Sequence, residues 1–98
     1  MDSDKYEKRM NKVIDNPCPR EVAKAFKSAF PDKFMYNSNG WHINIENDAY
    51  RHIEDGELRM FIDQQFSPLI TDKKLLTKLM TNGFKHSICC ELRNHYRR

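Results

Sequence analysis

The chain has 98 residues, of which 39% are hydrophobic and 32% are charged, and its net charge is +3. This length supports one modest hydrophobic core, and the composition excludes disordered and fibrous classes of protein. No apolar run approaches the roughly 20 residues that span a bilayer, and the first residues lack a signal-peptide pattern, so we predict an intracellular protein with no membrane segment.

The first third of the chain predicts two amphipathic helices. In the first, an apolar stripe recurs at helical spacing: Tyr6, Met10, Val13 and Ile14. The prolines of "DNPCP" end this helix. Pro19 suits the first turn of the second helix, and Pro31 closes it. The predicted buried face of the second helix consists of Val22, Ala23, Phe26 and Phe30.

A β-hairpin follows. The stretches "KFMYN" and "WHINI" flank Ser38-Asn39-Gly40, and an Asn-Gly pair supplies the positive φ angles of a tight turn. We expect Trp41, Ile43 and Ile45 to share one face of the second strand. The stretch "YRHI" adds a short third strand. The only tryptophan, Trp41, is expected to anchor this hairpin on the core rather than to read a ligand.

The last part of the chain returns to a helical period. One apolar stripe, ended or kinked by Pro68, contains Leu58, Phe61, Ile62, Phe66 and Leu69. Thr71 or Asp72 caps the next helix, whose stripe contains Leu75, Leu76, Leu79 and Met80. Asn82-Gly83 is expected to form its left-handed C-cap. A final helix is predicted from about Phe84 to Tyr96, with Phe84, Ile88, Leu92 and Tyr96 facing inward.

These elements predict an α+β fold, in which a small antiparallel β-hairpin or meander packs on a bundle of about five helices. Residues 1–98 form a single domain, with residues 1–16 as an N-terminal helical extension. The three cysteines, Cys18, Cys89 and Cys90, do not form a secreted disulfide framework, so we expect reduced thiols.

Charge is unevenly distributed along the chain. The net charge is +2 over residues 1–33, −4 over residues 34–66 and +5 over residues 67–98. The basic residues of the last segment suit contact with DNA phosphates, although a solvated helix face has the same pattern. They are Lys73, Lys74, Lys78, Lys85, Arg93, Arg97 and Arg98. The polarity also suits head-to-tail association into a homo-oligomer.

No catalytic motif is present, because a P-loop, a dinucleotide-binding turn and a nucleophile elbow are all missing. The stretch "HSICC" places His86 near Cys89 and Cys90 on one helix, but it lacks the paired-cysteine spacing of structural zinc sites. His42 and His52 lie in an acidic segment with Glu46, Asp48, Glu54 and Asp55, which are candidate ligands of a nuclease metal. A solvated hairpin edge explains them better. We therefore predict no catalytic residue, no metal and no cofactor.

Residues 72–97 also match the outline of a helix-turn-helix, in which the hairpin would act as a wing. This suggests an alternative function as a small winged-helix-like DNA-binding regulator. The start of the last helix, however, lacks an Arg, Asn or Gln cluster for reading base edges, so contact with the DNA backbone is the better prediction.

The run "DKFMYNSNGWHINIENDAYRHIEDGELRMFI" resembles the domain that precedes the ATPase in poxvirus-type, superfamily-three primase-helicases of large DNA viruses and phages. The matching positions are Phe34, Tyr36, Gly40, Trp41, Tyr50, Asp55, Leu58 and Arg59, and "LLTKLMTNGFKHSICCELRNHY" is similar to the helical end of that domain. The resemblance covers roughly residues 19–97. Tyr50 stands where the family often has a second tryptophan, and the Walker-type ATPase is absent.

The resemblance implies a non-catalytic accessory or collar domain in viral DNA replication. Such a domain would mediate subunit assembly beside a helicase ATPase and make sequence-independent DNA contact. It would act in the host cytoplasm or at a viral replication site.

Overall fold

The computed structural model describes residues 3–47 and 49–97, and it has the predicted α+β fold. In chain order, its elements are α1 (Ser3–Asp15), α2 (Pro19–Ala29), β1 (Phe34–Asn37), β2 (Gly40–Glu46), β3 (Ala49–Ile53), α3 (Asp55–Phe61), α4 (Lys73–Leu79) and α5 (Asn82–Tyr96). A π-helical turn, Ile62–Phe66, and a 3₁₀ turn, Ser67–Leu69, connect α3 to α4.

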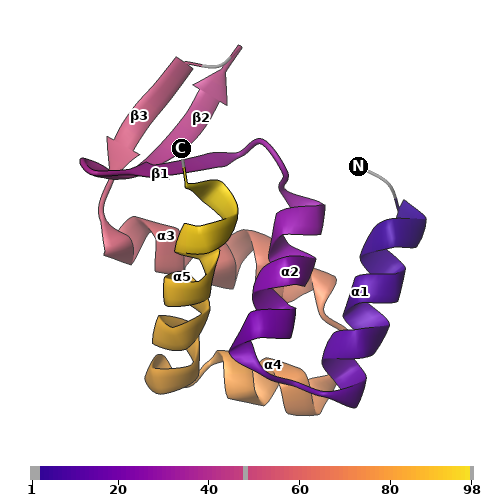
Figure 1. Ribbon diagram of the computed structural model, residues 1–98. Helices are drawn as coiled ribbons and strands as arrows, with labels where there is room; N and C mark the ends of the chain where they lie inside the picture. The colour runs from indigo at the N-terminus through magenta and orange to yellow at the C-terminus, as the bar shows by residue number, and fades with distance from the viewer. Residues whose placement is uncertain (1–2, 48, 98) are drawn as a thin grey trace.

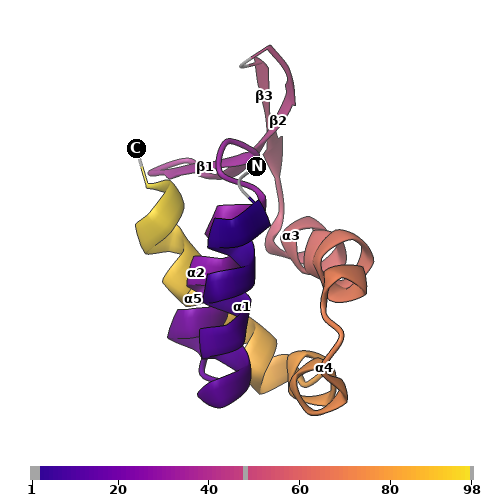
Figure 2. The ribbon, with the colours of Figure 1, turned by 90° about the vertical axis from the view of Figure 1, so that its right-hand side faces the viewer.

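The sheet and α4 lie at opposite ends of the molecule. Figures 1 and 2 show α1, α2 and α5 side by side, with the sheet beyond one end of these helices and α4 crossing the other. The β2–β3 hairpin projects away from the helices. The last turn of α5 ends beside β1, where Tyr36 and Arg97 form an isolated parallel bridge. The fold therefore separates the acidic middle of the sequence from the lysine-rich α4.

The core is built around aromatic rings. Phe26 of α2 is fully buried, and its ring packs 5.2–5.8 Å from those of Phe34 and Phe66 and 6.3 Å from that of Tyr96. The Tyr96 hydroxyl donates a 2.6 Å hydrogen bond to the carbonyl of Phe30. Burial raises the pKa of Tyr96 far above its ordinary value. This tyrosine therefore ties the end of α5 to the end of α2.

The helix α1 belongs to the same core. Met10 and Val13 are buried against α2, as their spacing predicts, so the expected N-terminal helical extension packs against this core. Ile14, in contrast, is 41% exposed, because it lies at the edge of the stripe. Pro19 occupies the first turn of α2, as predicted.

The sheet is an antiparallel meander in the order β1-β2-β3. The predicted role of Trp41 as an anchor is confirmed, since it is 2% exposed and its ring lies 5.0 Å from Tyr36 and 6.0 Å from Tyr96. Ile43 is partly buried on the same face. Ile45, in contrast, is 60% exposed and lies outside the core. The β2–β3 register shifts between Asn44 and Glu46, where the hairpin has already left the helices.

The β1–β2 turn differs in detail from the predicted one. Gly40 has a φ of +102°, but Asn39 is not among the described residues with positive φ. Asn37 instead stabilises the turn, because its side-chain oxygen accepts a 2.8 Å hydrogen bond from the N–H of Asn39. Only the glycine therefore needs the left-handed region.

The path from α3 to α5 contains one confirmed prediction and one error. Asp72 caps α4, since its carboxylate accepts a 2.8 Å hydrogen bond from the N–H of Leu75. Asn82-Gly83, however, is not a C-cap. Thr81 is extended and serves as the N-cap position of α5, and its carbonyl accepts from the N–H of Lys85, so α5 begins at Asn82 rather than at Phe84. Leu69 and Met80, predicted as apolar-stripe residues, are 41% and 50% exposed.

Candidate nucleic-acid interface

The fold separates the predicted basic residues into different places. Lys73, Lys74 and Lys78, hereafter the α4 lysines, lie on the helix at the end of the molecule opposite the sheet. Arg93 and Arg97 belong to the C-terminal end of α5, beside β1. Lys85 is in the interior, and Arg98 lies outside the described residues. The seven residues therefore do not form one continuous surface.

The α4 lysines occupy one arc of their helix. They are exposed together with Thr77, whereas Leu75 and Leu79 are 2% and 0% exposed on the opposite side. Lys74 and Lys78 are four residues apart and therefore neighbours on the helix, and Lys73 lies about 100° around the helix from Lys74, on the side away from Leu75 and Leu79. No ion pair involves an α4 lysine within the part of the chain that the structure describes. Their charges are therefore directed to solvent.

Further basic residues lie at the same end of the molecule. Lys12 is in the last turn of α1 and Arg20 in the first turn of α2, and both side chains are exposed. These helix ends and α4 lie on the side of the molecule away from the sheet (Figure 1). Because like charges on one surface add to its potential, this end is the candidate surface for contact with a polyanion.

Lys85 is not part of this surface, which corrects the prediction for it. It is 7% exposed, and its Nζ lies 2.8 Å from Oδ1 and 3.0 Å from Oδ2 of Asp63. This pair connects the π-helical turn to α5. No local sequence pattern predicts this pair, because the partners are 22 residues apart. A buried ammonium with a carboxylate partner has a structural role rather than a phosphate-binding one.

Arg93 and Arg97 lie near the first strand. The Arg93 guanidinium carbon is 5.3 Å from the centre of the Tyr36 ring, a cation–π contact. Arg97 is exposed and, with Tyr36, Asn37 and Ser38, lines an open pocket of about 280 Å³. Arg93 is therefore used largely in packing, and Arg97 is the more accessible cation at this end.

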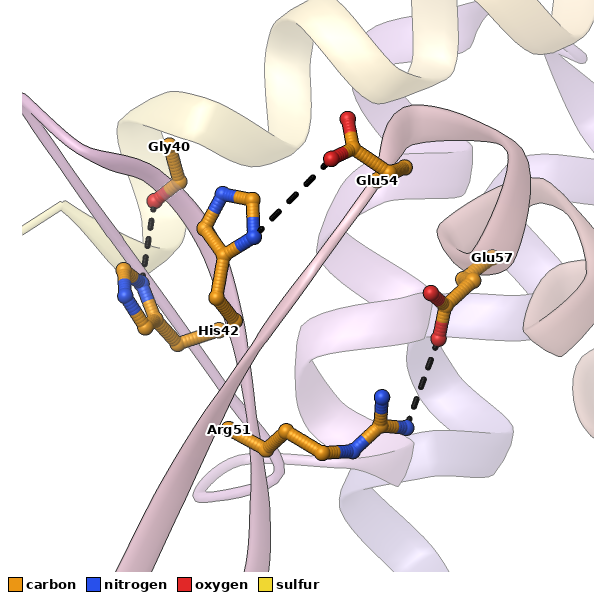
Figure 3. A network of polar contacts seen from close by, with 6 residues as sticks. Gly40, His42, Arg51, Glu54 and Glu57 are labelled. Carbon is orange, nitrogen blue, oxygen red and sulfur yellow. Dashed lines mark hydrogen bonds and ion pairs between the residues drawn. The ribbon is translucent and has the colours of Figure 1, made fainter.

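The histidines of the acidic segment form structural contacts between the strands and α3. The register places His42 directly opposite His52, with their ring centres 5.3 Å apart. Nδ1 of His42 lies 3.2 Å from the carbonyl oxygen of Gly40, and Figure 3 draws this contact. Nδ1 of His52 lies 4.0 Å from a carboxylate oxygen of Glu54.

An ion pair accompanies these histidines. Nη2 of Arg51 in β3 lies 3.3 Å from Oε2 of Glu57 in α3. This ion pair links the projecting hairpin to the helix (Figure 3). Across residues 3–47 and 49–97, no group of three or more His, Cys, Asp or Glu side chains is placed to hold a metal ion. Asp48, one of the candidate ligands, falls outside these ranges.

His86 and the two neighbouring cysteines diverge. Nε2 of His86 lies 3.7 Å from the Cys90 sulfur, and its Nδ1 accepts a 3.2 Å hydrogen bond from Arg59. Cys89 is buried on another side of α5, and burial raises the pKa of its thiol to about 11. Cys18, Cys89 and Cys90 are free thiols. Cys89 is part of the hydrophobic core, where a small buried thiol serves as a packing residue.

No family model, curated protein or solved structure matches the chain. No helix among the described residues is long and apolar enough to cross a bilayer.

Proposed function

We propose that this chain is a non-catalytic accessory domain of a viral replicative primase-helicase. In this proposal it contacts the DNA backbone through the α4 lysines without reading sequence, and its other surfaces contact the helicase ATPase domain or neighbouring subunits. It acts in the host cytoplasm or at a viral replication site. The hairpin motif with Gly40 and Trp41 supports the family assignment.

The observation that carries the DNA part is the exposed arc of α4. Three lysines that form no ion pair with any described residue project from one side of this helix, at the end of the molecule away from the acidic hairpin. Phosphate contact by lysine is electrostatic and independent of sequence, and it releases condensed counterions. The acidic hairpin, at the far end, would face away from bound DNA.

The alternative, a winged-helix-like regulator, has less support. It requires the first turns of α5 to face base edges, but Lys85 is buried there and His86 is held by Arg59. The sheet lies beside the opposite end of α5, so the hairpin would not flank these turns as a wing. These observations support backbone contact over base readout.

Replacement of the α4 lysines tests the proposal. We expect Lys73→Gln/Lys74→Gln/Lys78→Gln to weaken binding to a single-stranded or duplex oligonucleotide of random sequence, measured by fluorescence anisotropy across a salt series. For duplex DNA, loss of three phosphate contacts should reduce the slope of log K against log salt by about 2.7.

A matched control removes three lysines elsewhere. Lys8→Gln/Lys24→Gln/Lys33→Gln lowers the net charge equally but leaves α4 intact. This variant should keep most of the salt dependence. An equal loss of DNA affinity in both variants would show that only the net charge matters. Selection of a preferred duplex sequence by the wild-type chain would favour the winged-helix-like regulator instead.

A further inference from the structure

The open pocket beside Arg97 lies where the end of α5 meets the β1–β2 turn. Its volume is about 280 Å³, and it is lined by Tyr36, Asn37, Ser38 and Arg97. Each of these side chains carries a polar group, and none carries a carboxylate. The backbone bridge between Tyr36 and Arg97 holds the two segments together (Figure 1). Two parts of the chain that are distant in sequence therefore form one polar site.

The hydrogen-bonding groups that remain free in this pocket are mainly donors. Oδ1 of Asn37 already accepts the 2.8 Å hydrogen bond from the N–H of Asn39, which leaves the amide nitrogen of Asn37 as a donor. The guanidinium of Arg97 contains donors only, and the hydroxyl of Ser38 can donate as well. A ligand that satisfies these groups must present several acceptor oxygens.

Two guanidinium groups lie at this end of α5. Arg93 precedes Arg97 by four residues, and its guanidinium carbon is 5.3 Å from the centre of the Tyr36 ring. Neither arginine forms an ion pair with a described residue, and the buried Nε of Arg93 has no acceptor among these residues. The dipole of α5 places about half a negative charge at its C-terminus, so the two arginines leave a net charge of about +1.5 there.

We propose that this pocket binds a dianionic phosphate group, either free phosphate or the phosphate of a monoester. Such a group carries a charge of about −1.5 to −2 at pH 7 and three acceptor oxygens, which matches both the charge and the donors of the site. The Arg97 fork binds two phosphate oxygens, Asn37 and Ser38 donate to the third, and Arg93 adds positive charge beside the Tyr36 ring.

The size and charge of the pocket exclude larger and less charged ligands. Sites for drug-sized molecules have volumes of about 300–1,000 Å³, so this pocket holds a phosphate group and the atoms next to it rather than a whole cofactor. A carboxylate, or a phosphodiester of the DNA backbone, carries only one negative charge. It would neutralise less of the positive charge at the end of α5.

This site goes beyond the proposed function, because it is separate from the DNA contact. The pocket lies at the sheet end of α5, whereas the α4 lysines lie at the opposite end of the molecule (Figures 1 and 2). An oligonucleotide without terminal phosphates should therefore not displace bound phosphate. Failure of phosphate binding would leave the DNA contact unaffected, and the reverse also holds.

Backbone NMR of the full chain, titrated at constant ionic strength with inorganic phosphate and with methyl phosphate, tests the proposal. We expect the amide shifts of Asn37, Ser38 and Arg97 to saturate with a Kd of about 1 mM, which two charge-assisted hydrogen bonds can supply. The compound that binds more tightly identifies the source of the phosphate group, free or esterified. Dimethyl phosphate and acetate, with one negative charge each, should bind at least about tenfold more weakly.

A pair of arginine variants locates the binding. Arg97→Gln should weaken phosphate binding at least about tenfold, because the bidentate contact is lost. The Arg97 side chain is exposed, and the fluorescence of Trp41, 5.0 Å from Tyr36, verifies that the variant keeps its fold. Arg20→Gln is the matched control, because it removes the same charge from an exposed position in the first turn of α2 and should leave the affinity unchanged.

Three results would overturn the proposal. The first is the absence of saturable shifts up to about 10 mM of either phosphate compound, which is tenfold above the expected Kd. The second is an equal loss of affinity in the Arg97 and Arg20 variants. The third is binding of acetate or dimethyl phosphate as tight as that of the dianions.

Discussion

Removing the carboxylate of Asp63 should destabilise the domain more than removing the ammonium of Lys85. The two side chains form one ion pair, but the Lys85 side chain is 8% exposed and that of Asp63 is 39% exposed. Asp63→Asn leaves a buried ammonium without its counter-charge, whereas Lys85→Met keeps the aliphatic stem and leaves a carboxylate that water can reach. An uncompensated buried charge costs about 3–5 kcal/mol.

Because the site is partly open to water, we expect Asp63→Asn to lower the free energy of unfolding by about 2–3 kcal/mol and Lys85→Met to lower it by at most about 1 kcal/mol. Urea unfolding followed by tryptophan fluorescence measures both, and the double variant gives the coupling energy. Oligonucleotide binding by Lys85→Met should equal that of the wild type. The reasoning is refuted if Lys85→Met costs as much as Asp63→Asn, or if it weakens DNA binding at unchanged stability.

Two further predictions concern the core. Trp41→Ala should lower the free energy of unfolding by about 3–5 kcal/mol, since the indole is 2% exposed. Trp41→Phe should lower it less, because no described residue accepts a hydrogen bond from Nε1. Circular dichroism in urea measures both, and an alanine variant of wild-type stability would contradict the anchoring role. Above pH 9 the unfolded chain ionises Cys89 while burial holds the folded pKa at about 11, so stability should fall between these pH values by at most about 2.7 kcal/mol. Cys89→Ala should remove this part of the decrease in stability with pH. A variant whose stability falls with pH as steeply as that of the wild type would contradict the prediction.

The sequence predicted the elements that depend on local patterns. The burial of Met10 and Val13, the cap at Asp72 and the burial of Trp41 each follow from a short spacing or a single residue type. Such features are local because the neighbouring residues alone determine them. The order of helices and strands is correct for the same reason.

The sequence did not predict the features that depend on distant partners. Lys85 looks like any other lysine on an amphipathic helix until the fold brings Asp63 beside it. Ile45 continues the apolar alternation of its strand, but the helices end before reaching it. Asn82-Gly83 has the composition of a C-cap, yet the extended Thr81 is the N-cap position of α5, so Gly83 lies inside that helix. In each case tertiary geometry overrides a local preference.

Backbone NMR during titration with a random-sequence oligonucleotide tests the central claim most directly. The account predicts that the largest amide shifts fall on residues 72–81, around the α4 lysines, and that the shifts diminish as salt is added. Shifts centred on the exposed start of α5 at His86 and Ser87, or on the hairpin around His42 and His52, would contradict it.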